Sequence, residues 1–282
     1  MVRGLYTGAS GMIVQMGRMD VISNNLANVN TPSFKRDLAV MKSFPEMLIR
    51  RINDDGVRIL PQIGSYDLMP VVGKMGTGVE LNEVFTEFTQ GAFQQTSNDF
   101  DIALEGRGFF TVDTGDGERY TRNGSFLLDS EGYLVTKDGY KVLGENGPIR
   151  LKKNNFIVDE DGNVFENAEY RDDPQRLVSM EENEWNQTVL VDRLKIVDFP
   201  KIRYVKKMGE SLYMETEYSG SAFIIRGERP KVHQGFLEAS NVNPVIEMVN
   251  LIEVHRNYEA SQRIVQAHDS ALGRVVNEVG KV

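Results

Sequence analysis

The longest helical pattern in this sequence opens with Asn241-Val242-Asn243-Pro244-Val245-Ile246-Glu247. Asn243 is a favourable N-cap, and Pro244 then occupies the first helical position, where its missing N–H costs nothing. Glu247 lies in the first turn, next to the positive end of the helix dipole. Only Gly273 and Gly280 interrupt the pattern after that point. We therefore predict one long helix over residues 243–282.

Apolar residues recur along this predicted helix with a period of seven. The first row consists of Leu251, Tyr258, Val265, Leu272 and Val279. The second row, three residues later, holds Val254 and Val275, with Ser261 and His268 between them. A seven-residue apolar repeat is typical of a coiled-coil seam.

The N-terminal residues show the same period. One row is Leu5, Met12, Met19 and Leu26, and the second is Val2, Ala9, Met16 and Ser23. The pattern ends at Asn28-Val29-Asn30-Thr31-Pro32, because the residue before a proline is disfavoured in the helical region. The two terminal helices either pair with each other across the whole chain or each pair with another copy.

The residues that follow Pro32 predict a connecting segment. Ser43 and Glu46 form a capping-box signature, which predicts a short helix that Asp54-Asp55-Gly56 ends. Its apolar face would contain Phe44, Met47, Leu48 and Ile52. Residues 57–80 carry prolines and glycines and predict extended chain.

From about residue 84 the pattern is typical of β-structure. Short apolar or alternating runs are separated by turn pairs such as Asn123-Gly124, Asp138-Gly139 and Asp161-Gly162, which favour tight hairpins. Residues 166–187 are polar and predict a surface insertion. The predicted fold class is α+β. Residues 1–32 plus 243–282 form a helical terminal domain, 33–83 connect, and 84–242 form a β-rich domain.

The composition excludes several classes of protein. The 282 residues are 40% hydrophobic and 26% charged, as in globular chains. A net charge of −9 argues against a dedicated nucleic-acid binder, which needs a basic surface. No apolar run is long enough to span a membrane. We expect no secretory signal peptide, because residues 1–15 lack a clear apolar block with a cleavage site.

No residues form a convincing catalytic, cofactor or metal site. The chain has no cysteine, which excludes disulfides and thiolate metal ligands. His255 and His268 are thirteen residues apart on the predicted helix, which is not a metal-binding spacing. The aspartates of the turn pairs are better explained as turn residues than as calcium ligands. The chain is therefore predicted not to be an enzyme.

Four stretches together resemble one family, the flagellar hook–basal-body and rod proteins. They are residues 5–12 with 23–35, residues 76–79 with 89–96, residues 101–110 with 120–126, and residues 234–260. They reach almost from end to end. The motif residues that carry the resemblance at the two ends are Asn24, Asn25, Asn28, Asn30, Thr31, Pro32, Asn241, Asn243 and Pro244. Ser33 departs from the family pattern, in which glycine usually follows Thr-Pro.

The resemblance implies an axial structural subunit of the bacterial flagellum. Such a subunit is exported as an unfolded chain through the flagellar type III export apparatus and joins the basal-body rod in the periplasmic space. Its partners are further copies and other rod or hook subunits, with no nucleic acid, small-molecule substrate or cofactor. Its terminal helices pack between subunits, and we assign this packing to Leu5, Met12, Met16, Met19, Leu26, Leu251, Val254, Tyr258, Val265 and Leu272.

Within this family, residues 275–280 and the insertion at 166–187 resemble the proximal-rod subunit more than the distal one. The distal-rod subunit of the same family is the first alternative. The second comes from another class: a β-rich secreted enzyme or adhesin that oligomerises through its terminal helices.

Overall fold

A computed structural model describes residues 2–50, 57–60, 64–67, 71–153, 155–167, 188–209, 211–225, 227 and 229–279. The chain divides into two compact units. Unit 1 contains Met1–Asn24, Asp37–Val84 and Val245–Val282, and unit 2 contains Asn25–Arg36 and Phe85–Pro244. Along the chain, a β-rich middle lies between an N-terminal and a C-terminal helix, which confirms the predicted α+β class. Residues 37–84 group with the helices, whereas 25–36 group with the β-rich unit.

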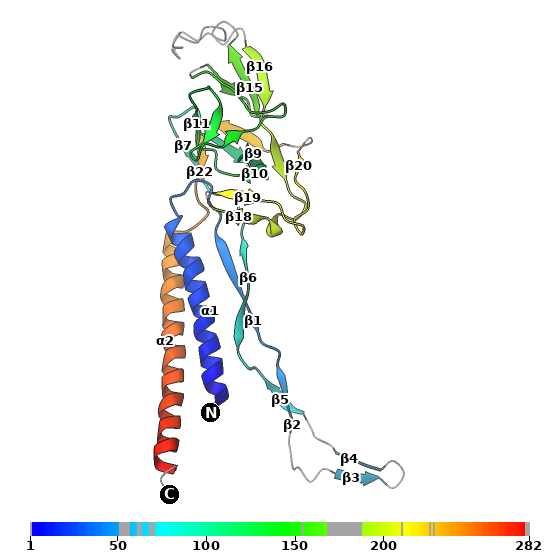
Figure 1. Cartoon of the computed structure of the whole chain (residues 1–282), viewed down its shortest axis with the longest axis vertical. Coiled ribbons are helices and arrows are strands. Elements are labelled where there is room, and N and C mark those ends of the chain that lie inside the picture. The colour runs from blue at the N-terminus through cyan, green and yellow to red at the C-terminus, as the bar shows by residue number, and fades with distance from the viewer. Residues whose placement is uncertain are drawn as a thin grey trace. The chain divides into compact units, whose positions relative to one another are not determined.

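Two long helices run side by side in unit 1 (Figure 1). The helix α1 covers Val2–Ala27, and α2 covers Pro244–Arg274. One π-helical turn, η3, continues α2 over Val275–Val279. The start of α2 at Pro244 confirms the predicted first helical position.

The predicted seam on α2 is confirmed over most of its length. The seven positions from 251 to 272 in the two rows are all buried or half-buried, and Val254 is 0% exposed. These positions are Leu251, Val254, Tyr258, Ser261, Val265, His268 and Leu272. Val275 departs from the seam because it is exposed within η3.

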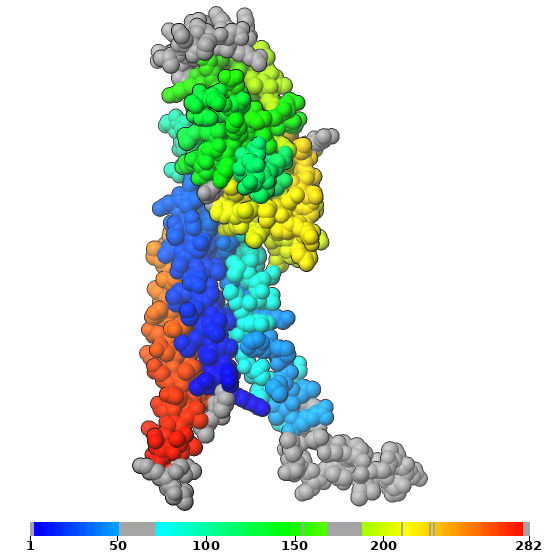
Figure 2. Space-filling view, viewed as in Figure 1, coloured from blue at the N-terminus to red at the C-terminus, as the bar shows by residue number. Residues whose placement is uncertain are grey.

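In the second row of the predicted seam on α1, Ala9 is half-buried as expected, but Met16 and Ser23 are exposed. The close contacts with α2 are made instead by three glycines. A Cβ on Gly4 would lie 2.3 Å from His268 Nε2, one on Gly8 would lie 2.8 Å from Val265 Cγ2, and one on Gly11 would lie 3.3 Å from Ser261 Oγ. Figure 2 shows the atoms of α1 packed directly against those of α2. The helices therefore pair within one chain, through a row that has no side chains.

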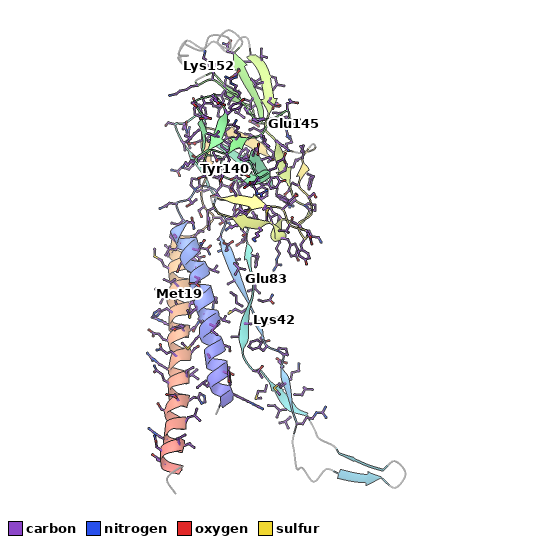
Figure 3. All side chains as sticks on the ribbon, in the orientation of Figure 1. Met19, Lys42, Glu83, Tyr140, Glu145 and Lys152 are labelled. Carbon is purple, nitrogen blue, oxygen red and sulfur yellow. The ribbon has the colours of Figure 1, made fainter. Side chains whose placement is uncertain are left out.

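The rest of unit 1 is a ribbon of paired strands. Strand β1 (Asp37–Ser43) pairs with β6 (Val79–Thr86), β2 (Met47–Arg50) with β5 (Val71–Met75), and β3 (Val57–Leu60) with β4 (Gly64–Asp67). Lys42 and Glu83 both project from the β1–β6 part (Figure 3). This part also contacts α1. Val79 N donates to Ser10 Oγ at 3.4 Å, and a Cβ on Gly17 would lie 3.0 Å from Leu81.

The short helix predicted after Ser43 is wrong. Residues 47–50 form strand β2, with Met47 opposite Met75 and Ile49 opposite Gly73. The capping-box signature is a local preference, and the antiparallel partner strand overrides it by pairing the backbone groups. Residues 57–60, 64–67 and 71–75 of the predicted extended segment are strands as well.

Unit 2 is built around a nine-stranded sheet. Strand β9 lies at its centre, with β10 on one side and both β13 and β17 on the other. The strands of this sheet are β9 (Phe109–Asp113), β10 (Glu118–Thr121), β11 (Phe126–Leu128), β12 (Leu134–Thr136), β13 (Lys141–Val142), β17 (Ile196–Asp198), β18 (Lys206–Met208), β19 (Leu212–Met214) and β20 (Phe223–Ile224).

Further strands surround this sheet. A three-stranded sheet contains β14 (Ile157–Val158), β15 (Asn163–Asn167) and β16 (Thr188–Arg193). Two pairs follow, β21 (Lys231–Gln234) with β8 (Ile102–Glu105) and β22 (Phe236–Glu238) with β7 (Phe93–Gln95). A 3₁₀ turn, η2, covers Ile202–Tyr204.

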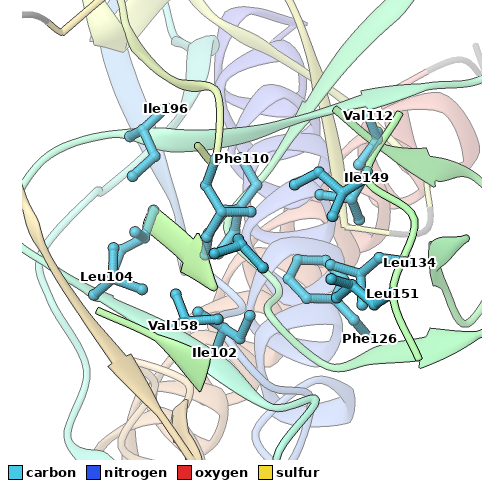
Figure 4. Close-up of a cluster of buried hydrophobic side chains, with 14 of the residues drawn as sticks. Ile102, Leu104, Phe110, Val112, Phe126, Leu134, Ile149, Leu151, Val158 and Ile196 are labelled. Carbon is cyan, nitrogen blue, oxygen red and sulfur yellow. The ribbon is translucent and has the colours of Figure 1, made fainter. Parts of the chain in front are cut away.

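The nine-stranded sheet buries apolar residues on both faces, because successive side chains of a strand point to opposite sides. On β9, Phe110 and Val112 belong to the larger cluster, and Phe109 belongs to the smaller one. Figure 4 shows the larger cluster, in which the rings of Phe110 and Phe126 meet at 5.2 Å between centroids. Phe109 packs against Phe199 on the other side, at 5.5 Å. This double core explains why so many short strands hold together.

Most of the predicted turns are confirmed. The hairpins β11–β12, β12–β13 and β14–β15 turn at Gly132, Gly139 and Gly162, which have φ values of 84°, 88° and 77°. Asn123-Gly124 is not such a turn. A Cβ on Gly124 would lie 1.6 Å from the carbonyl oxygen of Ile102, so this glycine allows two backbones to approach closely.

The predicted insertion at 166–187 lies mostly outside the described residues. Its first two residues, Glu166 and Asn167, are buried in strand β15 and are not part of a surface loop.

The contrast between two glycines of unit 2 is testable. We expect Gly124→Ala to lower the free energy of unfolding by at least 3 kcal/mol, because a backbone atom blocks the new methyl group. Gly115→Ala, which faces open space at φ 80°, should cost only about 1 kcal/mol of left-handed strain. Thermal and denaturant unfolding of the full chain measure both. Equal losses would contradict the role given to Gly124.

Candidate functional site: an exposed apolar face and a buried charge cluster

Each helix of the pair carries large apolar residues on the side turned away from the other helix. On α2 we call Val245, Met248, Val249 and Ile252 the outer stripe, and on α1 we call Tyr6, Ile13 and Met16 the outer face. All seven side chains are at least half exposed, up to 69% for Ile13. The residues of each set are neighbours on their own helix, and exposed apolar groups of this kind indicate an interaction site on each of the two surfaces.

Helical geometry explains why this surface faces away from the pair. With 3.6 residues per turn, the outer stripe lies about 160° around α2 from the seam residues. The outer face of α1 lies about 160° around that helix from Gly4, Gly8 and Gly11. The residues that hold the two helices together are thus on the sides opposite to those that remain exposed.

The residues predicted to pack between subunits lie mainly inside unit 1. Val254 is buried, Met16 is exposed, and the other eight are half-buried: Leu5, Met12, Met19, Leu26, Leu251, Tyr258, Val265 and Leu272. The contacts of α2 within its own chain engage Val265 directly. The exposure of Val249 and Ile252 could be expected from the sequence, because both residues fall outside the heptad rows.

Unit 2 contains a buried cluster of three charged side chains, which we call the Glu238 cluster. Lys35 Nζ lies 2.5 Å from Glu238 Oε1, and Arg122 Nε lies 2.9 Å from Glu238 Oε2. The side chains are only 2%, 7% and 1% exposed for Lys35, Arg122 and Glu238. The cluster joins the segment after α1 to the segment before α2, 203 residues apart in sequence for Lys35 and Glu238.

Backbone groups complete the Glu238 cluster. Lys35 Nζ donates to the carbonyl of Thr89 at 2.8 Å, and Gly91 N donates to Glu238 Oε1 at 2.9 Å. Arg122 donates to the carbonyl oxygens of Gly108, Leu104 and Gly106. Every charge is therefore hydrogen-bonded, as buried charges must be.

The electrostatics favour an ionised Glu238. Burial alone would raise the pKa of Glu238, but the charges of Arg122 and Lys35, with hydrogen bonds from Lys35 and Gly91, outweigh burial and hold that pKa below its ordinary value. Burial lowers the pKa of Lys35, an effect that Glu238 opposes and Arg122 reinforces.

Asn241 ties the same segments together next to the cluster. Its Oδ1 accepts from Arg36 N at 2.8 Å, and its Nδ2 donates to the carbonyl of Glu87 at 2.9 Å. Arg36 Nε also lies 2.5 Å from Glu87 Oε2. Asn241 of the motif thus connects two segments of unit 2 that are distant in sequence.

The N-terminal motif residues end α1. Thr31 N donates to the carbonyl of Asn28, and Thr31 Oγ1 donates to Asn28 Oδ1 at 3.2 Å. Asn25 is buried, Pro32 is half-buried, and Asn24 and Asn30 are exposed. At the start of α2, Asn243 is exposed and Pro244 half-buried. The motif is therefore a set of turns that leads the chain from the helix to the Glu238 cluster.

Ser33 has an unusual conformation at this junction. Its φ is 57°, in the left-handed region that favours glycine, and its N–H donates to the carbonyl of Glu238 at 2.7 Å. The residue is buried, and among the described residues its Oγ is the one buried side-chain polar atom without a hydrogen-bond partner. The serine that departs from the family pattern therefore sits at a position suited to glycine.

Unit 2 also has an open pocket of about 830 Å³ between residues 128–132, 146–153 and 191–192. Its lining mixes Asp129, Glu131 and Asp192 with Arg150 and Lys152, and includes no histidine. In the described part of the chain, no group of three or more side chains is placed to bind a metal ion, and neither helix is long and apolar enough to cross a membrane.

The buried charge at Glu238 predicts a large effect of its removal. Glu238→Gln leaves two buried cations without a counter-ion, so the free energy of unfolding of unit 2 should fall by about 3–5 kcal/mol. Glu87→Gln breaks the part-exposed pair with Arg36 and should cost less than about 1 kcal/mol. Denaturant unfolding at pH 7 measures both.

The same substitution predicts a change in pH dependence. Because the folded-state pKa of Glu238 is depressed, its stabilising contribution is present above the unfolded pKa of about 4.3 and is lost as the pH falls through the folded pKa. The wild type should therefore lose stability more steeply below about pH 4 than Glu238→Gln. Parallel acid profiles would show that Glu238 is not the titrating group.

The strain at Ser33 predicts a stabilising substitution. Ser33→Gly relieves the left-handed conformation and removes the unpaired hydroxyl, so it should raise the free energy of unfolding by about 1 kcal/mol. Ser211→Gly is the matched control, since Ser211 has a φ of 60° but is only half-buried. Calorimetric melting temperatures give the comparison. A lower melting temperature for Ser33→Gly would mean that the hydroxyl contributes a contact.

Comparisons with known proteins agree with this architecture. Three family models match: the flagella basal body rod protein over residues 5–35, the flagellar hook protein FlgE/F/G D1 domain over 103–166, and the flagellar basal body rod FlgEFG protein C-terminal over 233–278. The first and last models contain the two terminal helices with their motif residues.

Whole-length relatives agree with the family models. The flagellar basal-body rod protein FlgG of Bacillus subtilis is 33% identical, with 98% of this chain and 99% of the relative covered. FlgF of Caulobacter vibrioides is 32% identical over 100% of both chains. The hook-basal body complex protein FlhO of Bacillus subtilis is 31% identical over 100% of both. The chain belongs to the flagellar basal-body rod protein family, of the FlgF and FlgG type.

Proposed function

We propose that this chain is a structural subunit that polymerises through its terminal helices into the tubular rod, the drive shaft that transmits torque in the flagellum. The observation that carries the proposal is the pair of exposed apolar surfaces, the outer stripe of α2 and the outer face of α1. Copies of the chain are its partners in this proposal, together with other rod and hook subunits.

The energetics support association through this surface. Burying a fully exposed large apolar side chain contributes roughly 1.5–3 kcal/mol, and these seven side chains are on average only about 60% exposed, so covering them contributes about 6–12 kcal/mol. Association costs about 4–15 kcal/mol in lost freedom and ordering. A contact of this size, repeated along a polymer, holds the subunits in place. This structural role requires neither catalysis nor ligand binding by the chain.

The β-rich unit has a different role in this proposal. Its two-sided core and its buried charge cluster make it a folded body that does not need the polymer, whereas the helices present the assembly surface. We propose that the chain is not an enzyme. The competing class, a secreted enzyme or adhesin, needs convergent titratable groups, and the mixed-charge pocket of unit 2 does not offer a recognisable set among its lining residues.

The location and rod position are further parts of the proposal. We propose export through the flagellar type III apparatus and assembly in the periplasmic space, which the resemblance to the family supports. The proximal position remains a prediction from residues 275–280 and 166–187, since relatives named FlgG and FlgF both match the whole chain. Labelling the subunit in isolated basal bodies and locating the label along the rod by electron microscopy tests it.

A charge on the outer stripe tests the assembly surface. The double variant Val249→Asp/Ile252→Asp should fail to form rods and abolish swimming of a strain that carries it as its single copy, because carboxylates cannot be buried between subunits. Asn257→Asp/Gln262→Asp adds the same charge at exposed polar positions of α2 and should assemble normally. Circular dichroism should give the same helix content for both.

Normal rods in the outer-stripe variant would contradict the proposal. Loss of helix content in that variant would assign the defect to folding, and in that case the milder pair Val249→Ser/Ile252→Ser is compared in the same way.

A further inference from the structure

We propose that the outer face of α1 in one copy packs antiparallel against the outer stripe of α2 in a second copy, with that copy displaced along the helix axis by about two turns. This inference rests on the proposed function and adds the register of the contact. Both surfaces lie in unit 1, so their relation follows from contacts within that unit.

The glycine contacts fix which residues of α1 and α2 lie at the same level. Gly4 contacts His268, Gly8 contacts Val265, and Gly11 contacts Ser261. Following this antiparallel register, Ile13 is level with Glu259, and the outer stripe of α2 is level with the last turns of α1. The two apolar surfaces of one chain therefore lie at different heights along the pair.

A neighbour without displacement brings unlike residues together. Its Ile13 would face Glu259, its Met16 would face Arg256, and its Asp20 would face Ile252. Glu259 and Arg256 occupy the same outward side of α2 as Ile252, since they continue its i, i+4 and i, i+7 rows. This register buries charges against apolar groups and leaves the outer stripe uncovered.

A displacement of two turns, about 11 Å at 1.5 Å per residue, brings like residues together. Ile13 then faces Ile252, and Met16 faces Val249. Asp20, which is exposed, faces Val245 in the first turn of α2, where the positive end of the dipole favours a carboxylate. In this register Tyr6 is level with Glu259, so two of the three outer-face residues meet apolar partners, whereas none does without displacement.

The occupant is a second copy of this chain for two reasons. The outer stripe offers apolar partners to Ile13 and Met16 of the outer face, and Asp20 lies level with the positive end of α2 in the same register. The antiparallel direction is also the one in which α1 and α2 already pair within a chain, so all copies keep the same polarity. A heterologous contact with an axial shift does not close into a dimer, and it generates an open helical array.

Disulfide crosslinking tests the register, and the absence of native cysteine makes it direct. A tagged Ile13→Cys chain is assembled with an untagged Ile252→Cys chain and oxidised. We expect a crosslinked heterodimer, because a disulfide requires Cα atoms within about 7 Å. The control mixes Ile13→Cys with Glu259→Cys, on the same side of α2 but two turns away, and we expect at least tenfold less heterodimer.

The outcomes separate this inference from the proposed function. If electron microscopy shows polymers but the Glu259→Cys mixture crosslinks, the register is wrong and the proposed function still holds. The same conclusion follows if polymers form and neither mixture crosslinks. Failure of the wild-type chain to polymerise under conditions that assemble other rod subunits overturns the proposed function and this inference with it.

Discussion

The ion pair between Lys35 and Glu238 is the constraint on which the junction of this chain depends. It joins segments 203 residues apart, and Arg122 closes the cluster from a third part of unit 2. Buried ion pairs add little net stability over apolar packing, but breaking one is costly. Its value here is specificity. Apolar residues can slide against one another, whereas a carboxylate held by Lys35, Arg122 and Gly91 N–H accepts one arrangement.

That arrangement also brings together the two chain segments of unit 2 that flank the helices. Ser33 N donates to the carbonyl of Glu238, and Asn241 N donates to the carbonyl of Phe34, so the chain after α1 and the chain before α2 are bound to each other. The segment after α1 and the segment before α2 are thus held to each other within unit 2. The antiparallel pairing of the two helices then costs little further loop entropy, because the long connection between them is already closed.

The sequence was informative where large residues repeat and uninformative where contacts depend on glycine or on distant partners. On α2 the heptad rows predicted the buried side, because the side chains of the seam form a repeat that is visible in the sequence. On α1 the contact residues are Gly4, Gly8 and Gly11, which an apolar repeat does not register. Their spacing of four and three was the available signal. The helix predicted from Ser43 and Glu46 failed because pairing with residues 71–75 decides that segment. The Glu238 cluster could not be predicted, since no local pattern relates Lys35 to a residue 203 positions away.

The glycine row also explains why an assembly surface exists at all. Without side chains at Gly4, Gly8 and Gly11, the first three turns of α1 approach α2 closely. The large residues of α1 are then free to lie at the edge of the pair or on its outer face, as Met12 and Ile13 do. On α2 the seam is filled with apolar residues, and the outer stripe adds a second apolar side only in its first two turns. A helix that is apolar on opposite sides needs two partners, one in its own chain and one outside it. The chain provides the first partner through α1, and the proposed polymer provides the second.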